Sequence, residues 1–388
     1  MNAFKFFIKQ LLILTSVLYL ISAYYTQPRR VHIFIDYATS PTVLQMTEFI
    51  RLPEKDVKII GWNRFKNRSH IIKKHKIQKN VIEVSSILKK SSKEKIETFS
   101  HILQGIEASN AQTIYEIHLN YKHIGWLGIQ LFKLIPPHKI KQVHIYEDGS
   151  GTLYKDVNNK NIHKHALNFA TQFQTELKKT TPSLYHPNVY LITIPMFYPT
   201  TYHTTIVNKA KLIQKQAIYK HFKKLTFMPV DFRKLKTELT SQEKTKLYQL
   251  LDIDFSHITK YIQKDKPFGL FLWDGMNLPV RYQAEKKLLD KMEEHSQKYG
   301  TIWFSKNHPT AHSPYLPRPF LKPLPAHFPM EVLMISDYPF QYVAGAGSSA
   351  FYSLKPEEII GYIPNRYWSY VKSLINLKIL DNEKVYYW

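Results

Sequence analysis

Short apolar runs recur along this chain, and each one ends in a polar, turn-forming segment. In the first half these runs are rich in β-branched and aromatic residues, as buried strands are, and they cover residues 31–35, 57–62, 114–119 and 142–146. Helically spaced apolar residues lie between them, for example across 43–50. Strands that alternate with helices predict an α/β fold with parallel sheets and right-handed crossovers.

The second half of the chain repeats this alternation. Strands are predicted at 267–273, 300–304 and 342–345, and helices at 210–222, 241–251, 282–299 and 368–377. The last strand of the first half is predicted at 189–194, and Pro195 and Pro199 follow it. We therefore place a domain junction near 195–205, with a first domain at 31–200 and a second at 201–365. The 388 residues are enough for two domains.

Residues 1–30 form a separate N-terminal segment. Residues 10–28 carry no charge, whereas Lys5 and Lys9 precede them and Arg29 and Arg30 follow them. This stretch is marginal for a membrane span of about 20 residues. Its basic flanks favour an uncleaved membrane anchor or an interfacial helix over a buried helix of the globular part. The alternative of a signal peptide, which would export the protein, has only a weak cleavage site at Ser22-Ala23.

The composition narrows the chemistry. No cysteine is present, which excludes disulfides, thiolate nucleophiles and Cys-ligated metals. The net charge of +24 favours anionic partners. Lysines cluster at 73–76 and 89–95 beside apolar positions, which is typical of a solvated helix face; attraction to an anionic membrane surface is the alternative.

Polar segments follow the predicted strands at 36–42, 61–64, 148–151, 273–275, 305–309 and 346–349. Ligands of open α/β sheets bind beyond the carboxyl ends of the strands, so two sheets with facing loops would form one cleft. The segment Gly345-Ala346-Gly347-Ser348-Ser349 allows a close backbone approach, and the helix N-terminus that follows would attract an anion. A tight strand–helix turn capped by serine would have the same sequence.

Two further segments are ambiguous when taken singly. Asp148 follows a strand within Glu147-Asp148-Gly149, where a carboxylate could accept a proton but where Asp-Gly is also a common turn. His308, which precedes Pro309, could donate to a leaving phosphate or could be an ordinary loop histidine. Lys306 adds a positive charge two residues earlier.

In combination and in this order, these segments resemble glycosyltransferase family 80, the bacterial sialyltransferases. The resemblance covers roughly 31–378 and rests on 35–46, 62–65, 146–150, 198–203, 306–309, 329–333 and 347–354. The chain departs from the family pattern at Glu147, where the family often has Asp, and at Gly151, where many members carry a larger residue. The segment around Trp273 matches less clearly.

The resemblance implies a GT-B fold, in which two Rossmann-like domains with parallel sheets face each other across a deep cleft. It also implies that the C-terminal helix, 366–388, joins the first domain. The implied reaction is inverting and metal-independent, needs no cofactor, and moves sialic acid from CMP-sialic acid to a terminal galactoside of a lipooligosaccharide-type glycan.

The resemblance also assigns roles to individual residues. Asp148 would be the general base, and His308 would donate to the departing CMP phosphate, which Ser348 and Ser349 would hold. Donor binding would further involve Lys306 at the cytosine, Glu331 at the ribose, and Pro309. The acceptor site would be lined by Arg64, His118, Ser150 and Trp273, the last as a stacking platform.

One Asp-x-Asp, Asp252-Ile253-Asp254, could hold a cation for the donor phosphate. It follows a predicted helix rather than a strand, and no other acidic cluster is close in sequence, so we interpret it as a helix-end turn.

Two rival functions remain open. A transferase that uses CMP-Kdo or another CMP-nonulosonate would carry the same nucleotide motifs. A basic nucleic-acid-binding protein would explain the charge but not the cleft motifs, and no nucleic-acid module is recognisable. Because CMP-sugars are made in the cytoplasm, we expect the catalytic body there, at the inner membrane, with no nucleic-acid partner.

Overall fold

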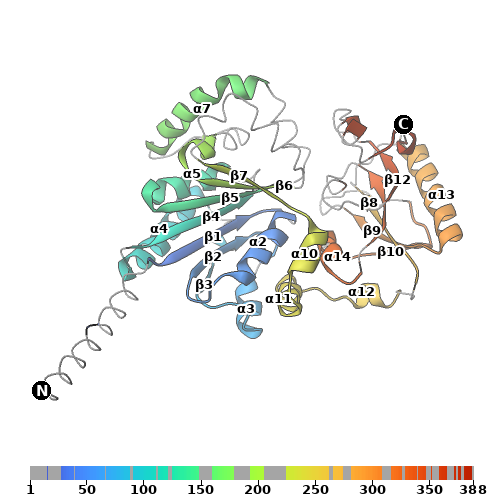
Figure 1. Cartoon of the computed structure of the whole chain (residues 1–388), viewed down its shortest axis with the longest axis horizontal. Coiled ribbons are helices and arrows are strands. Elements are labelled where there is room, and N and C mark those ends of the chain that lie inside the picture. Colours follow the sequence, from blue (N-terminus) through green and yellow to red (C-terminus); the bar gives the residue numbers. More distant parts are fainter. Residues whose placement is uncertain are drawn as a thin grey trace, which may run out of the picture.

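Two parallel β-sheets, one from each half of the chain, make up the protein (Figure 1). The computed structural model describes residues 15, 28–38, 40–65, 67–87, 91–110, 112–120, 125–147, 160–178, 193–204, 224–261, 265–273, 281–307, 316–325, 328–338, 340–346, 351, 358–364, 371–372, 375–376 and 380–386.

The first sheet has seven parallel strands in the order β3-β2-β1-β4-β5-β6-β7. They are β1 (Arg30–Asp36), β2 (Val57–Trp62), β3 (Val81–Glu83), β4 (Ile114–Asn120), β5 (Ile140–Tyr146), β6 (Thr200–Thr204) and β7 (Leu225–Pro229). The strand order reverses between β1 and β4, the position at which doubly wound sheets bind their ligands.

The second sheet has five parallel strands in the order β10-β9-β8-β11-β12. They are β8 (Phe268–Trp273), β9 (Ile302–Asn307), β10 (Leu321–Pro323), β11 (Tyr342–Ala346) and β12 (Glu358–Ile363). Its order is that of the first sheet without the last two strands, so β8 and β11 are here the pair at which the order reverses. The predicted α/β class with two Rossmann-like parallel sheets is confirmed.

Helices cover both sheets. They are α2 (Ser40–Arg51), α3 (Arg68–Lys74), α4 (Ser92–Ser109), α5 (Gly125–Leu134), α7 (Lys160–Lys178), α10 (Phe232–Glu238), α11 (Ser241–Leu251), α12 (Ser256–Thr259), α13 (Tyr282–Tyr299) and α14 (Met330–Ile335), with single 3₁₀ turns η3 (Pro137–Lys139) and η6 (Asn382–Lys384). Capping boxes start two of the long ones: Ser91 with Glu94 at α4, and Thr240 with Glu243 at α11.

The first sheet is buried on both faces. One face packs against α4, α5 and α7 through Phe99, Phe132 and Phe173. The other face, which carries Phe34 and Trp62, packs against α2. Because both faces are covered, buried residues follow one another along β1, β2 and β6 instead of alternating with exposed ones.

A single apolar core joins the two halves. It contains Phe49 of α2 and Leu250 of α11 together with Leu270 of the second sheet and Val332 of α14. Figure 1 shows α10 and α14 between the two sheets. The halves are therefore packed together rather than connected only by a linker.

Three sequence expectations differ from the structure. The first sheet continues past the predicted domain boundary at 200, because β6 and β7 both pair with it. Residues 193–197 are helical, so the strand predicted at 189–194 does not reach its expected end. Of the C-terminal segment, Val385 bridges to Tyr362 of β12, which attaches this part of 366–388 to the second sheet instead of the first.

Within the part of the chain that the structure describes, no helix has the length and apolar character needed to cross a membrane. The predicted anchor at 1–30 lies outside the described residues except for Thr15 and residues 28–30.

Candidate functional site

The predicted site residues fall into two groups. Asp148, Ser150, His308, Pro309, Ser348 and Ser349 lie outside the described residues. Arg64, His118, Trp273, Lys306 and Glu331 are described, and they lie in or directly after strands or in the first turn of a short helix.

Lys306 and Glu331 come together at the carboxyl end of the second sheet. Lys306 is the fifth of the six residues of β9, and Glu331 lies in the first turn of α14; their exposed fractions are both 5%. Burial lowers the pKa of Lys306 to about 8, and the charge of Glu331 opposes this shift. The ammonium group donates to the carbonyl of Pro325 at 3.4 Å. A buried cation beside a carboxylate suits a polar ligand with both acceptors and hydroxyl donors.

The end of β5 is fixed by a hydrogen bond to β6. Glu147 is 8% exposed, and its Oε2 accepts a 2.7 Å hydrogen bond from the hydroxyl of Thr204. Its backbone N–H donates to the carbonyl of His203 at 3.1 Å. These two contacts fix the residue directly before Asp148.

A buried carboxylate organises the carboxyl ends of β1 and β4. Asp36 has no exposed surface, and its Oδ1 accepts from the backbone N–H of Ala38 at 2.7 Å and from Asn120 Nδ2 at 2.9 Å. Gln45 donates to Oδ2 at 3.2 Å and accepts from the indole N–H of Trp62 at 2.9 Å. The network joins three strand ends to α2, at the position where the strand order reverses.

Arg64 is the one predicted acceptor residue that the structure both describes and leaves exposed. It follows β2, and its Nε donates to the carbonyl of Tyr37 at 3.3 Å. Its guanidinium therefore lies beside the turn that Asp36 anchors.

His118 and Trp273 are almost entirely enclosed, with 3% and 4% of their surface exposed. His118 stacks between Phe34 and His144, and its Nδ1 lies 2.9 Å from the hydroxyl of Tyr146. The guanidinium carbon of Arg281 lies 5.1 Å from the ring centre of Trp273. The acceptor contacts predicted for these two residues stay predictions.

Gly345 fixes the strand that leads to the predicted phosphate-binding turn. Its φ is 151°, and a Cβ at this position would lie 2.1 Å from the carbonyl oxygen of Leu272 in β8. Only glycine permits this approach. The small residue at 345 thus has a packing reason in addition to its place near Ser348.

The Asp-x-Asp at 252–254 is a helix-end turn, as interpreted from the sequence. Asp252 caps α11 with φ 58° and ψ 49°. Asp254 accepts hydrogen bonds from the backbone N–H and the hydroxyl of Ser256, at 2.8 and 2.6 Å. Across the described residues, one group of three could hold a metal ion, His32, Glu116 and His118, and it lies in β1 and β4.

No protein-family profile matches the sequence, and no curated protein matches it. Solved structures do match. An α/β-galactoside α-2,3-sialyltransferase from the luminous marine bacterium Photobacterium phosphoreum superimposes with a TM-score of 0.70 over 93% of this chain and 99% of its own, at 19% identity. The GT-B domain of a Photobacterium damselae sialyltransferase matches with a TM-score of 0.68 over 92% of this chain and 100% of its own, at 17% identity.

The chain has the GT-B fold.

A third GT-B structure was solved with ligands. It is a Photobacterium 2,6-sialyltransferase in a ternary complex with CMP, its donor product, and lactose, its acceptor substrate. It matches with a TM-score of 0.68 over 93% of this chain and 78% of its own, at 16% identity. The GT-B architecture expected from the sequence motifs is confirmed by these three likenesses.

Sequence reasoning missed several residues that hold this site. Glu147 was treated only as a neighbour of Asp148, although it forms the bond to Thr204. The partners of Asp36 were missed because Gln45 and Asn120 are separated from it in sequence and meet it only in the folded sheet. Asp36 and Asn120 are the last residues of β1 and β4, and a polar residue at a strand end was the available signal for these two.

Proposed function

We propose that this protein is an inverting sialyltransferase that moves sialic acid from CMP-sialic acid to a terminal galactoside of a bacterial surface glycan of the lipooligosaccharide type. The observation that carries the proposal is that Lys306 and Glu331 are both buried at the carboxyl end of the second GT-B sheet, close enough for their charges to interact. Three GT-B structures with TM-scores of 0.68–0.70 are sialyltransferases, and one binds CMP and lactose.

The donor is assigned to the second half. Lys306 donates to the cytosine, and Glu331 accepts from the ribose hydroxyls, because a carboxylate is the natural partner of two adjacent hydroxyl groups. Pro309 borders this site. Ser348 and Ser349 bind the phosphate, which the helix N-terminus behind them favours.

The reaction is a single displacement at the anomeric carbon. Asp148 takes the proton of the acceptor hydroxyl, whose oxygen forms the new bond as the bond to the CMP phosphate breaks. His308 donates to the departing phosphate, where negative charge accumulates. Attack on the face opposite the leaving group inverts the configuration, and the transition state is oxocarbenium-like.

The acceptor is assigned to the first half. Arg64 is exposed beside the turn at Tyr37 and can donate to sugar hydroxyls, and Ser150 follows the general base. The Glu147–Thr204 bond supports the position of Asp148, because a base displaced by an ångström loses much of its effect.

We further propose that transfer needs no metal or other cofactor, since His308, the two serines and a helix N-terminus can stabilise the charge on the phosphate. Transfer that persists at full rate after dialysis against a chelator is the expected result; loss of activity that added divalent ions restore would contradict it.

The decisive experiment is a donor-by-acceptor screen with the linkage of each product determined. CMP-sialic acid with lactose should give product, while CMP-Kdo should release CMP no faster than a blank. Asp148→Asn and His308→Ala should each lower transfer by at least about 10² with folding retained, since a positioned acid or base contributes that much. Faster turnover of CMP-Kdo than of CMP-sialic acid would show that Kdo, and not sialic acid, is the sugar transferred.

We place the catalytic body on the cytoplasmic side of the inner membrane, held by the N-terminal segment. External protease on spheroplasts should leave it intact. Its digestion from outside would support export by a signal peptide.

A further inference from the structure

Histidines line one face of the first sheet. His32 of β1, His118 of β4, His144 of β5 and His203 of β6 come from consecutive strands. The rings of His118 and His144 stack with centroids 4.4 Å apart, and His144 Nδ1 lies 3.1 Å from His203 Nε2. Glu116 lies on the same face as His118, two residues earlier in β4. None of these side chains except His118 has a place in the proposed transfer site.

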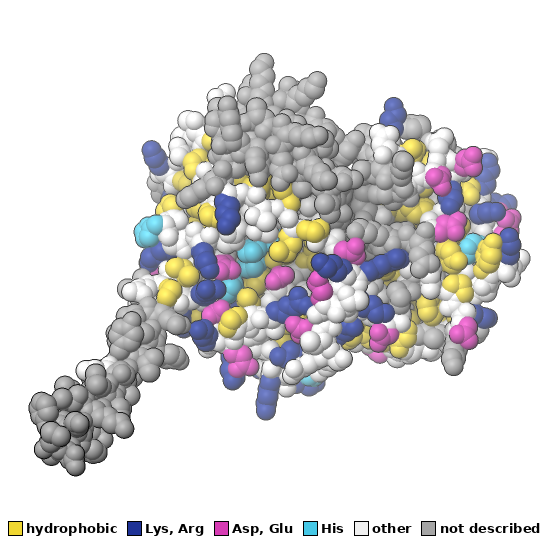
Figure 2. Space-filling view, viewed as in Figure 1, with side chains coloured by type: hydrophobic (Ala, Val, Ile, Leu, Met, Phe, Trp, Pro, Cys, Tyr) yellow, Lys and Arg dark blue, Asp and Glu magenta, His cyan; other side chains and the backbone are white. Residues whose placement is uncertain are grey.

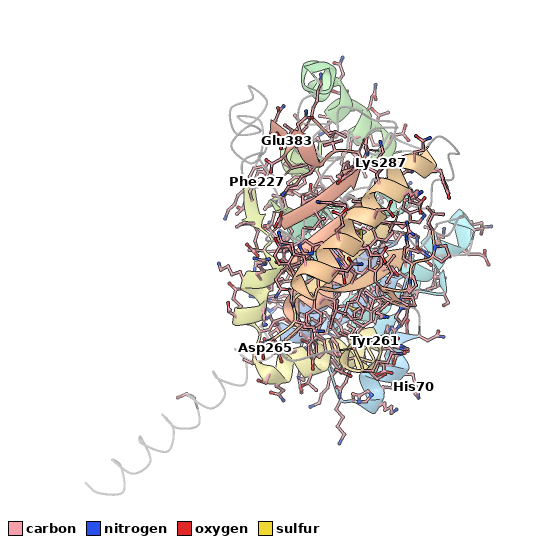
Figure 3. The ribbon with its side chains drawn as sticks, turned by 90° about the vertical axis from the view of Figure 1, so that its right-hand side faces the viewer. His70, Phe227, Tyr261, Asp265, Lys287 and Glu383 are labelled. Atoms are coloured by element: carbon pink, nitrogen blue, oxygen red, sulfur yellow. The ribbon has the colours of Figure 1, made fainter. Side chains whose placement is uncertain are left out.

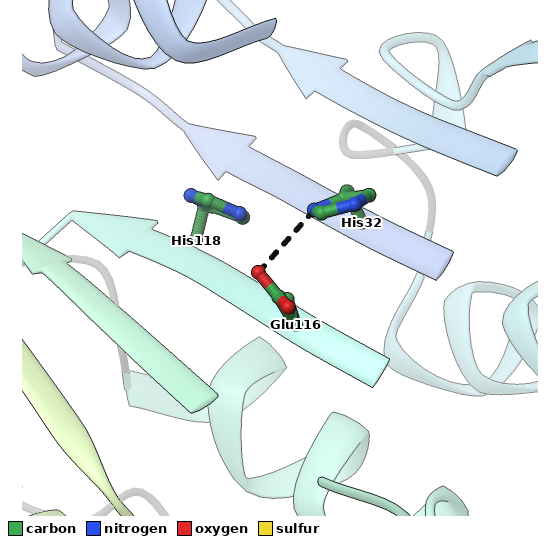
Figure 4. Close-up of side chains that lie close together, drawn as sticks. All are labelled: His32, Glu116 and His118. Carbon is green, nitrogen blue, oxygen red and sulfur yellow. Dashed lines mark ion pairs between the residues drawn. The ribbon is translucent and has the colours of Figure 1, made fainter. Parts of the chain in front are cut away.

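Three of these side chains converge. One ligand atom from each of His32, Glu116 and His118 lies within 4.8 Å of the other two (Figure 4). His32 Nδ1 and a carboxylate oxygen of Glu116 are 3.7 Å apart, too far for a hydrogen bond. Zinc–nitrogen and zinc–oxygen bonds of about 2.1 Å in a tetrahedral site put ligand atoms ~3.4 Å apart. The His32 nitrogen and the Glu116 oxygen already have nearly this separation, and the His118 nitrogen needs to move by about an ångström to reach it.

Two ring nitrogens in this group are buried and unpartnered. Neither His32 Nδ1 nor His118 Nε2 has a hydrogen-bond partner within the part of the chain that the structure describes, and the two residues are 2% and 3% exposed. A buried polar nitrogen without a partner is costly, and such atoms mark a missing ion or water.

The second nitrogen of each ring is already held. Asp56 Oδ2 lies 3.3 Å from His32 Nε2, and the hydroxyl of Tyr146 lies 2.9 Å from His118 Nδ1. A carboxylate behind a histidine is the usual support for a metal ligand, because it fixes the ring and increases the basicity of the free nitrogen. The nitrogen that is left free on His32 is the one that faces Glu116.

The charges around the group suit a divalent cation. Lys141 lies 3.7 Å from the other oxygen of Glu116, and His144 Nε2 lies 3.9 Å from the oxygen that faces His32. Two neutral imidazoles, a carboxylate and a neighbouring third imidazole form a set of the type that zinc prefers.

We propose that His32, Glu116 and His118 form a binding site for a divalent transition metal, with Zn²⁺ as the preferred ion. The ion connects β1 to β4 on the face that also carries Phe34. It is a structural ion, because its ligands lie on the face of the sheet and not in the loops beyond the strand ends; His118 then serves as a metal ligand instead of the acceptor contact expected from the sequence.

The test uses full-length protein without a polyhistidine tag, titrated with ZnCl₂ by calorimetry and with CoCl₂ by visible absorption. One equivalent should bind in each titration, and Zn²⁺ should raise Tm. Glu116→Gln should weaken Zn²⁺ binding by at least tenfold, and Asp56→Asn, which alters only the support of His32, by about 10–100-fold.

His70→Gln is the matched control. His70 is exposed on α3 and is labelled in Figure 3. The His70→Gln variant should therefore bind Zn²⁺ with the affinity of the wild type. Failure of the wild type to take up one equivalent, or equal affinity in Glu116→Gln and His70→Gln, would overturn the proposal. If Glu116→Gln does not fold, Asp56→Asn decides in its place.

Discussion

Replacing Lys306 should change CMP binding and the stability of the protein in opposite directions. Its side chain is 5% exposed, and burial lowers its pKa from 10.5 to about 8. Each pKa unit corresponds to 1.36 kcal/mol, so holding the charge in the folded protein costs about 3 kcal/mol. Lys306→Met removes this cost and loses about 1 kcal/mol for the hydrogen bond to Pro325. The variant should therefore be more stable than the wild type by about 2 kcal/mol at pH 7.

The pH dependence follows from linkage. Below about pH 8 Lys306 is protonated in both the folded and the unfolded chain, so the full cost is present there. As the pH rises from about 8 to 10.5, the folded chain releases the proton first and the cost disappears. The difference in unfolding free energy between the variant and the wild type should consequently fall across this window.

Binding should change in the opposite direction. A charge-assisted hydrogen bond is worth about 1.5–3 kcal/mol, so Lys306→Met should weaken CMP binding by about 10–100-fold. Urea unfolding and CMP calorimetry at several pH values measure both quantities. Lys287→Met serves as the control, because Lys287 is exposed on α13 (Figure 3). A variant that is no more stable at pH 7, or that binds CMP like the wild type, would refute this account of Lys306.

Three further changes test other features. Glu331→Gln should weaken CMP binding by about tenfold in calorimetry but should not change the weaker binding of 2′,3′-dideoxy-CMP, which lacks the ribose hydroxyls. An equal loss of affinity for both nucleotides would show that Glu331 does not bind the ribose hydroxyls. Gly345→Ala should lower the Tm and weaken CMP binding together, because its Cβ meets the carbonyl of Leu272; an unchanged Tm would show that β11 can shift. Leu250→Ala should lower the unfolding free energy by about 2–5 kcal/mol in one urea transition detected by fluorescence; two separated transitions would contradict a core shared by both halves.

The strands that were predicted most accurately from the sequence are those buried on both faces. Residues 31–35 and 57–62 are mostly apolar and wholly buried, and the structure extends the first by one residue at each end. β6 was missed because its sequence, Thr-Thr-Tyr-His-Thr, is mostly polar although all five residues are buried. Its burial depends on β5 and β7 on either side, which no local pattern reveals.

The site residues that lie within short sequence motifs could be predicted from the sequence. Lys306 and Glu331 were assigned to one ligand from separate motifs, and the structure places them close enough for their charges to interact. The histidine face was not predictable, since His32 and His118 are 86 positions apart and are aligned only by strand register. The distribution of charge over the surface was not predictable from the sequence either. In Figure 2, basic and acidic side chains are interspersed across the visible face, although the sequence carries a net charge of +24.

The core that contains Phe49, Leu250, Leu270 and Val332 restricts how the two halves of this protein can move relative to each other. Separating the two halves there would expose tightly packed side chains to water, at a cost far above thermal energy. Any movement that admits the proposed nucleotide sugar must leave this core intact and rotate about it. Displacements should then grow with distance from this core, so the loops farthest from α2 and α14 would move most, while the strand ends nearest it keep their spacing throughout the cycle.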